Sequence, residues 1–531
     1  MILWGSNARE THPIFFHHVL KAIRRGGKLF VMDPRRTSSA EWADGWLQLD
    51  VGTDITLANG MARCILAEGL EHRSFIARAT EGFEAYSETV QRYDLARVSQ
   101  ETKVSPELIQ RVAREYARAD KAIICWTLGI TEHHNAVDNV CSLINLGLLT
   151  GHVGRWGSGL NPLRGQNNVQ GGGDMGALPN KLAGFQDVEN PVVRARYDQC
   201  WGRPVPPKKG WNLTEMFEAM ETKAMTGLYV LGENPAQSEA DSHHSMNLLK
   251  GLEFLLVQDI VMTKTAVMAD VVLPASASWC ESEGTVTNSE RRVQRCRRAL
   301  TPPGQARDDI VILADLSRRL GYDLGSSNPE AIWNEVRALS PMHAGMSYAR
   351  IEALDGIQWP CPDEQHPGTP FLHARLWSDP MVGPRAPFLP AEQVPPVDGL
   401  DASFPLRLTT GRRLESYNTG VQSGGFAWPH ARGETLDLSP EDARALDVSD
   451  GEWVRIVSRR GSVEVPVRII AGLRPGLVFM TVHFPDSVDT NTLTINATDP
   501  KSGTAEFKAS AVRVEKLSRA WQARPPAHAV S

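Results

Sequence analysis

The sequence contains no C-x-x-C pair, and this absence argues against several classes of site. Its seven cysteines are scattered and odd in number, which speaks against a disulfide framework, a zinc ribbon or an iron–sulfur cluster held by this chain. We expect most of them to be buried, unreactive thiols. They are Cys64, Cys125, Cys141, Cys200, Cys280, Cys296 and Cys361.

Long apolar runs, a charged-then-apolar leader and a basic stripe are also missing. We therefore expect a cytoplasmic protein without direct membrane insertion. The formal net charge of −6 gives no reason to expect a nucleic-acid partner. Pairs of adjacent histidines lack the i, i+4 spacing with a nearby glutamate that builds a zinc site, so we assign no metal ligand. These pairs are His17-His18, His133-His134 and His243-His244.

One loop is rich in glycines and amides and contains a single arginine. It reads Asn161-Pro-Leu-Arg164-Gly-Gln166-Asn-Asn168-Val-Gln170-Gly-Gly-Gly-Asp174-Met-Gly176. Glycines allow a backbone to approach a ligand closely, and Asn and Gln offer donors and acceptors to a polar cofactor. An arginine here can hold a carboxylate or a phosphate through two parallel hydrogen bonds. The alternative is a solvated loop whose arginine makes a surface ion pair.

The start of the chain has the pattern of a β–turn–α–β unit. An apolar run at 2–4 precedes the turn Gly5-Ser-Asn7, a helical pattern follows, and the buried strand 28–32 is closed by Asp33. This order predicts a parallel sheet with a right-handed crossover. Ligands of such sheets bind at the carboxyl ends of the strands, where the turn and Asp33 both lie. The turn is not a G-x-G-x-x-G, so an NAD fingerprint is absent.

The same order of elements returns in the middle of the chain. A strand at 227–231 leads into the turn Gly232-Glu-Asn-Pro235, and a strand at 254–257 leads into Gln258-Asp259. This repetition predicts two related cradles, which would suit two similar nucleotide-bearing halves of one cofactor.

A chain of 531 residues is too long for one core and should form several domains. Prolines are dense from about 355 to 405, as in a linker, and short strands recur beyond them, as in a small β-barrel. The predicted fold class is α/β, with two Rossmann-like parallel-sheet regions and a C-terminal barrel. We expect α/β cofactor-binding domains at 1–165 and 166–278, a mixed α+β region at 279–355, the linker at 356–404 and the barrel at 405–520.

The arginine loop resembles the active-site loop of the molybdenum- or tungsten-dependent formate dehydrogenases, within the molybdopterin oxidoreductase family. The resemblance covers nearly the whole chain and implies that the barrel is six-stranded, of the double-psi type, and closes over the cofactor. Other matching motifs occur in the family's order: Gly5-Ser-Asn7, Asp33-Pro-Arg35, Gly232-Glu-Asn234-Pro, Gln258-Asp259, Ala269-Asp-Val-Val-Leu-Pro274 and Glu283-Gly-Thr285.

This resemblance implies a bis(molybdopterin guanine dinucleotide) cofactor carrying Mo or W, bound through soft sulfur ligands. Arg164 would hold the formate carboxylate as hydride leaves carbon. Asp33 and Asp259 would each accept the N1–H and the exocyclic amine of one guanine, although either could instead be a turn cap. The other cofactor neighbours that the resemblance implies are Gly5, Asn7, Arg35, Gln166, Asn168, Gly232, Glu233, Asn234, Gln258, Thr410, Gly411, Arg412, His483, Asn491, Phe507 and Lys508.

No cysteine has a context that matches the family's metal thiolate. Because the opening strand begins at residue 2, we expect an incomplete catalytic subunit, whose missing N-terminal segment carries a [4Fe–4S] cluster and the metal ligand. By itself, such a chain would not oxidise formate. The expected partners are formate or CO2 and electron-transfer subunits that carry iron–sulfur clusters or flavin. The alternatives are a non-catalytic scaffold of the same fold, or another oxo-transfer reductase of the family, acting on nitrate or a sulfoxide.

Overall fold

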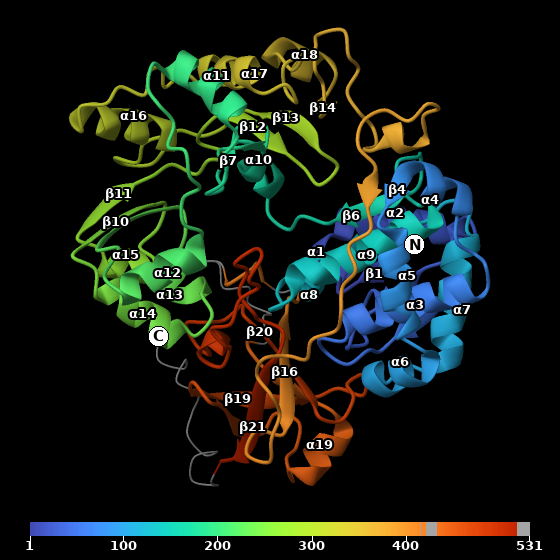
Figure 1. The fold of residues 1–531 in the computed structure, drawn as a ribbon. Helices are drawn as coiled ribbons and strands as arrows, with labels where there is room; N and C mark the ends of the chain where they lie inside the picture. The colour runs from blue at the N-terminus through green and yellow to red at the C-terminus, as the bar shows by residue number, and fades with distance from the viewer. Residues whose placement is uncertain (415, 421–432, 518–531) are drawn as a thin grey trace. The chain divides into compact units, whose positions relative to one another are not determined.

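The computed structural model describes residues 1–414, 416–420 and 433–517 (Figure 1). Contacts divide the chain into two compact units. The first unit contains residues 1–163 and 237–245 together with the described residues from 371 onward, and the second contains 164–236 and 246–370. The first unit therefore joins the start of the chain to its end.

A five-stranded parallel sheet forms the centre of the first unit, in the order β3-β2-β1-β5-β6. The order reverses at β1, which lies between β2 and β5. An α/β sheet leaves a crevice at such a switch point, outside the carboxyl ends of its strands. The strands are β1 (Ile2–Trp4), β2 (Phe30–Met32), β3 (Gly45–Leu47), β5 (Ile123–Trp126) and β6 (Gly159–Pro162).

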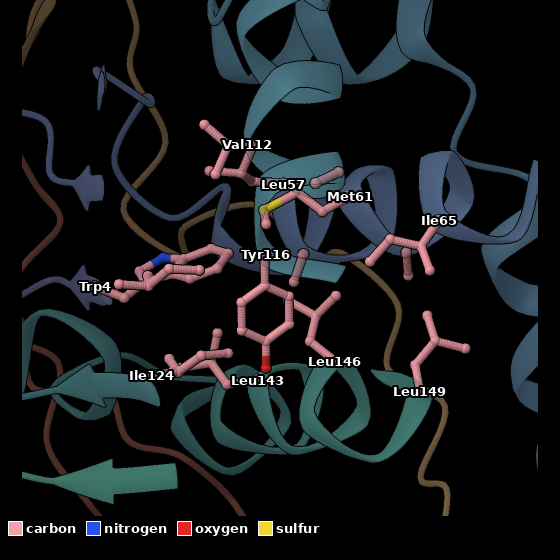
Figure 2. Packing of buried hydrophobic residues seen from close by; sticks show 14 of the residues in the cluster. Trp4, Leu57, Met61, Ile65, Val112, Tyr116, Ile124, Leu143, Leu146 and Leu149 are labelled. Atoms are coloured by element: carbon pink, nitrogen blue, oxygen red, sulfur yellow. The ribbon is translucent and has the colours of Figure 1, made fainter. Parts of the chain in front are cut away.

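Helices cover both faces of this sheet because successive side chains of a strand point to opposite sides. Ile2 and Trp4 belong to a large apolar cluster with α3, α7 and α9, whereas Leu3 packs with Phe16 of α2. Figure 2 shows the larger cluster, in which the Tyr116 ring lies among side chains of these helices. The helices are α1 (Ala8–Thr11), α2 (Pro13–Arg24), α3 (Asp54–Ala67), α4 (Arg73–Ala79), α5 (Phe83–Gln91), α6 (Leu95–Thr102), α7 (Pro106–Arg118), α8 (Leu128–Thr131) and α9 (Ala136–Thr150).

The end of the chain forms a closed barrel in the order β16-β20-β17-β19-β18-β21. Leu408, Val454, Val478 and Val512 are fully buried inside it. The predicted α/β class with a six-stranded C-terminal barrel is therefore confirmed. The barrel strands are β16 (Leu406–Gly411), β17 (Leu436–Leu438), β18 (Trp453–Ser458), β19 (Ser462–Ile469), β20 (Leu477–Thr481) and β21 (Ser510–Lys516), with α19 (Pro440–Ala445) between two of them.

The second unit contains a parallel sheet of order β11-β10-β9 and an antiparallel sheet of order β12-β13-β14. Its strands are β9 (Gly227–Leu231), β10 (Phe254–Asp259), β11 (Val271–Pro274), β12 (Gly284–Thr287), β13 (Arg292–Cys296) and β14 (Ile357–Gln358). Its main helices are α10 (Val169–Asp174), α11 (Pro191–Trp201), α12 (Leu213–Glu221), α15 (Lys264–Met268), α16 (Asp309–Arg319), α17 (Pro329–Leu339) and α18 (Tyr348–Ala353).

The two parallel sheets repeat the same local hydrogen bonds at the same spacing. Leu29 donates its backbone N–H to the Asp44 carboxylate, and Asp44 N–H donates back to Leu29 O. Leu255 and Asp270, also fifteen positions apart, exchange the same two bonds. The repetition is thus one of hydrogen bonding as well as of sequence pattern.

The proline-rich stretch is divided between the two units. Its β14 pairs with β13 in the second unit. In the first unit, β15 (Ala386–Pro387) pairs with β4 (Thr80–Glu81), and the Phe388 ring stacks on Tyr86. The expected domain boundaries stay predictions. Across the described residues, every helix is too short or too polar to cross a bilayer.

A backbone contact at the switch point gives a first testable prediction. Gly129 N–H donates to Gly5 O, and a Cβ on Gly129 would lie 2.6 Å from Gly5 Cα. We expect Gly129→Ala to lower the free energy of unfolding by about 1–3 kcal/mol through overpacking. Gly159→Ala is the control, because nothing lies within 4 Å of its added Cβ. Equal denaturation midpoints for the two variants would contradict the prediction.

Candidate functional site

The turn after β1 is held by close backbone contacts at the switch point. Gly5 has φ +54°, and its carbonyl accepts from Gly129 N–H and from the Thr127 hydroxyl. Asn7 is buried, and its Oδ1 accepts from the Ser39 hydroxyl at 2.9 Å. The turn is therefore rigid, and its polar groups lie where a ligand of the sheet would bind.

Asp33 follows β2 at the same edge of the sheet. It is buried, and its Oδ1 accepts from Arg35 N–H at 2.9 Å. Burial raises the pKa of Asp33, and the charges of Arg35 and Lys508 oppose that rise. The Arg35 guanidinium lies 3.6 Å from the centroid of the Phe479 ring in β20. The barrel thus contributes directly to the surroundings of this carboxylate.

Barrel residues predicted as cofactor neighbours fall into a connected polar group. Thr410 donates its hydroxyl to Phe507 O and accepts from Lys508 Nζ at its carbonyl. Lys508 is buried and pairs with Glu132 at 2.7 Å. Arg412 donates to Asn418 Oδ1. The charges of Arg412 and Arg35 are among those that oppose protonation of the buried Lys508, whose pKa is lowered chiefly by desolvation.

Asn491 lies in a short 3₁₀ helix, Thr490–Thr492, between β20 and β21. Its Nδ2 donates to the carbonyls of Gln237 and Ser238 at 3.2 Å. Its Oδ1 is buried and has no hydrogen-bond partner. This acceptor is available to a polar ligand.

In the second unit, the arginine loop ends in helix α10. Arg164 is exposed, its Nε donates to Gln170 Oε1 at 3.1 Å, and its backbone N–H donates to the Ser289 hydroxyl. The protein around the guanidinium lowers the pKa of Arg164 by desolvation, and the charge of Asp174 opposes this shift.

Other predicted loop residues have different surroundings. Asn168 has φ +69°, and its Oδ1 accepts from Thr287 N–H at 2.9 Å, which ties the loop to β12. A Cβ on Gly171 would lie 1.9 Å from that same oxygen, so only glycine fits beneath it. Gln166 is exposed. The glycines thus allow this loop to fold closely on itself.

The second cradle repeats the first at β10. Asp259 ends this strand, and its Oδ1 accepts from the N–H of the next residue, Ile260, whereas Asp33 accepts from Arg35, two residues along. Burial raises the pKa of Asp259. Gly232 has φ +64° and donates to Gln258 O, while Gln258 itself is buried and its amide contacts Tyr229 and Asp309.

Two further predicted residues of this cradle lie in the turn after β9. Asn234 is buried, and its Oδ1 accepts from the backbone N–H and from the hydroxyl of Thr265. Glu233 is exposed. The roles of these side chains in binding a cofactor stay predictions.

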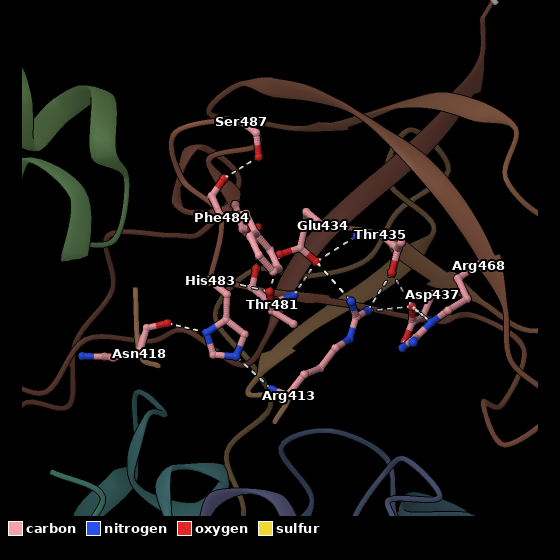
Figure 3. Close-up of polar contacts among 11 residues, drawn as sticks. Arg413, Asn418, Glu434, Thr435, Asp437, Arg468, Thr481, His483, Phe484 and Ser487 are labelled. Carbon is pink, nitrogen blue, oxygen red and sulfur yellow. Dashed lines mark hydrogen bonds and ion pairs between the residues drawn. The ribbon is translucent and has the colours of Figure 1, made fainter. Parts of the chain in front are cut away.

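One buried charged network in the barrel escaped the sequence analysis. Arg413 bonds to Asp437 at 2.9 Å and faces Glu434, whose pKa burial raises to about 7 (Figure 3). His483 Nε2 accepts from Arg413 N–H, so its Nδ1 carries the proton and donates to Asn418 O. Desolvation lowers the pKa of His483 to about 4, which keeps the ring neutral. His483 therefore orders the chain around Arg413.

A second network joins the barrel to the first sheet. Glu506 is buried and lies 3.4 Å from His133 Nδ1 and 3.3 Å from His134 Nδ1. His133 Nε2 lies 3.1 Å from Gly129 O, so both ring nitrogens face acceptors. Although desolvation opposes it, the charge of Glu506 raises the pKa of His133. The adjacent histidines in the sequence were the only signal for this pair.

Comparison with known proteins assigns the family. Residues 1–319 match the model described as "Molybdopterin oxidoreductase", and residues 406–511 match "Molydopterin dinucleotide binding domain". The chain belongs to the molybdopterin oxidoreductase family. The predicted resemblance is therefore confirmed.

Within this family the chain is similar to enzymes of more than one activity. It is 39% identical over 522 residues to the F420-dependent formate dehydrogenase subunit alpha of Methanocaldococcus jannaschii, covering 97% of this chain and 76% of that protein. It is 33% identical over 524 residues to the assimilatory nitrate reductase catalytic subunit of Bacillus subtilis, covering 97% and 74%. The acetylene hydratase of Pelobacter acetylenicus shares the fold, with a TM-score of 0.74 at 20% identity over 97% of this chain and 77% of that one.

The described residues suit a molybdopterin dinucleotide chemically. Ser6 Oγ, in the turn after β1, and Asn491 Oδ1 are both buried without a hydrogen-bond partner. A buried polar atom costs about 1–3 kcal/mol when it stays unpaired, so a ligand that pairs with it stabilises the fold. In the parts of the chain that the structure describes, no group of three or more His, Cys, Asp or Glu side chains could hold a metal ion.

The His133–Glu506 pair predicts a pH dependence of stability. Because the folded pKa of His133 is raised, its contribution is complete below the ordinary histidine pKa of about 6.5 and disappears as the pH rises through the folded value. We expect the thermal unfolding midpoint to fall as the pH rises above about 6.5, and to fall less in His133→Gln. The exposed His17→Gln is the control. If the unfolding midpoint changes equally with pH in the wild type and in both variants, an ionised His133 is contradicted.

Proposed function

We propose that this chain is the cofactor-binding body of a Mo- or W-dependent formate dehydrogenase that interconverts formate and CO2. The observation that carries the proposal is Arg164, a cation oriented by hydrogen bonds on a glycine-rich loop. The similarity to a formate dehydrogenase alpha subunit over 97% of the chain supports it. The electron acceptor would be an iron–sulfur or flavin subunit.

The cofactor would be a bis(molybdopterin guanine dinucleotide), and it would supply the redox chemistry when bound. Asp33 and Asp259 would each hold one guanine, because a carboxylate can accept two parallel N–H bonds from that base. Gly5, Asn7 and Arg35 would serve the same nucleotide as Asp33, and Gly232, Glu233, Asn234 and Gln258 would serve the same nucleotide as Asp259. Gln166 and Asn168 would touch the pterin. Arg412, Asn491, Phe507 and Lys508 would be further neighbours of the cofactor.

Arg164 would act on the substrate rather than on the cofactor. Its planar guanidinium can hold both oxygens of formate, which fixes the direction of the C–H bond. It would also keep the carboxylate fixed in place while the electron pair of the C–H bond passes to the cofactor. A preorganised donor of this kind contributes about 3–4 kcal/mol to a transition state.

Arg164→Lys tests this role in the assembled holoenzyme. Lysine keeps the charge but loses the planar fork, so we expect formate-dependent dye reduction to fall at least about 100-fold. Metal and guanine nucleotide content should stay at wild-type levels. Arg298→Lys is the matched control, because Arg298 is also exposed and in the same unit. Undiminished formate turnover in Arg164→Lys would refute the proposal. Efficient nitrate reduction by the wild-type enzyme, without formate oxidation, would also refute it.

The paired aspartates give an independent test of the two cradles. Removing one partner of a charged hydrogen bond costs about 1.5–3 kcal/mol of binding, so Asp33→Ala and Asp259→Ala should each retain less nucleotide. The measurement is GMP released from purified protein by acid hydrolysis. Asp44→Ala and Asp270→Ala are matched controls, because Asp44 bonds to Leu29, just before β2, and Asp270 bonds to Leu255, near the start of β10. A full nucleotide load in both test variants would make Asp33 and Asp259 turn caps.

A further inference from the structure

Three side chains behind Arg164 form a continuous hydrogen-bonded chain. Arg164 Nε donates to Gln170 Oε1 at 3.1 Å, and Gln170 Nε2 donates to Asp174 Oδ1 at 2.8 Å. The indole N–H of Trp359 donates to the second oxygen, Asp174 Oδ2, at 2.7 Å. All four residues belong to the second unit, so the chain is a property of that unit alone.

The order of donors and acceptors in this chain is dictated by chemistry. An ionised carboxylate can only accept, so Gln170 must turn its NH2 group toward Asp174 and its carbonyl toward Arg164. Arg164 can only donate, and the carbonyl is the one group of Gln170 that can receive that bond. Asp174 therefore sets the orientation of the Gln170 amide, and the amide sets the position of the Arg164 side chain.

Asp174, at the end of this series of hydrogen bonds, is held in place by its surroundings. Asp174 is 1% exposed, and Gln170 lies four positions before it, on the same face of α10. Burial raises the pKa of Asp174, but its bonds to Gln170 and Trp359 and the charges of Arg164 and Arg291 oppose that rise. Trp359 comes from a distant segment next to β14, so the tertiary fold fixes the anchor.

We propose that Gln170 and Asp174 are positioning residues that set the plane of the Arg164 guanidinium for the substrate carboxylate. This inference rests on the proposed role of Arg164. A misplacement of about 1 Å at a reacting centre can cost about 100-fold in rate, so fixing this plane affects turnover more than cofactor binding.

The test uses an isosteric substitution that reverses the direction of these hydrogen bonds. In Asp174→Asn, Trp359 still needs an oxygen, so the new NH2 group faces Gln170. Gln170 must then turn its carbonyl toward Asn and its NH2 toward Arg164, which puts two donors against each other. We expect kcat for formate oxidation by the holoenzyme to fall about 10- to 100-fold. Metal content, nucleotide content and thermal unfolding midpoint should stay close to wild type.

A second change should restore the order of donors. Adding Gln170→Glu to Asp174→Asn places an acceptor-only group between Asn NH2 and Arg164, so the double variant should regain at least half of the loss on a logarithmic scale. Gln170→Glu alone places two carboxylates side by side and should be impaired. In an Arg164→Lys background, Asp174→Asn should cause at most a twofold further loss, because the residue it positions has gone.

These outcomes separate the inference from the proposed function. If Arg164→Lys keeps full turnover, the proposed function itself fails. If Arg164→Lys is inactive while Asp174→Asn has wild-type kcat and KM, the proposed function stands and the positioning role is refuted. Loss of activity in Asp174→Asn in proportion to lost cofactor or folded protein, or no recovery in the double variant, would also refute it.

Discussion

The backbone contact between Gly5 and Gly129 constrains everything around the first strand end. A Cβ on either residue would lie within 2.8 Å of backbone atoms of the other, so neither position accepts a side chain without movement. The contact joins the turns after β1 and β5 at the switch point of the sheet. His133, which follows α8, contacts Gly129 O through one ring nitrogen and the Glu506 carboxylate of the barrel domain through the other. The position of the segment that contains Glu506 thus depends on two glycines.

Buried charge is the second constraint, and it is costly unless each group is paired. The first unit buries Asp33, Glu434, Glu506 and Lys508, and each of these has a partner in the structure. Such groups are weak evidence for stability, because well-packed apolar side chains would often serve as well. Their concentration at the carboxyl edge of the sheet and at the facing end of the barrel instead suits a polar, charged ligand. Perturbed pKa values of this kind occur often at functional sites.

The sequence predicted the elements whose signals are local. The apolar run at 2–4, the turn at Gly5 and the carboxylate at Asp33 are close together in the chain, and their order alone favoured a parallel sheet. Most barrel strands were predicted by their short, repeated patterns, but the three-residue strand β17 was not. The number of strands in the barrel and the cofactor came from the resemblance to the family, because no local pattern encodes barrel closure.

What the sequence could not show are pairs formed by distant residues. Arg413 meets Asp437 across a gap of 24 positions, and Glu506 meets His133 across 373. Apart from the adjacent histidines at 133 and 134, nothing in the neighbouring sequence marks these side chains as buried, since lone charged residues are usually exposed. The Leu29–Asp44 and Leu255–Asp270 exchanges were missed for another reason. Each aspartate directly precedes a strand, where a polar residue is common, and only the structure shows that the two make the same bonds.

A loop made largely of glycine cannot by itself hold an arginine in one place. Glycine allows close approach, but it also gives the backbone the most freedom to lose. The structure meets this requirement with groups outside the loop: Ser289 and Thr287 on the β12–β13 hairpin bond to its backbone and to Asn168, and Trp359 bonds to Asp174 at its end. The glycines allow the loop to fold closely, while the hairpin and Trp359 hold it in place. The position of Arg164 is therefore specified as much by residues more than a hundred positions away as by its own motif.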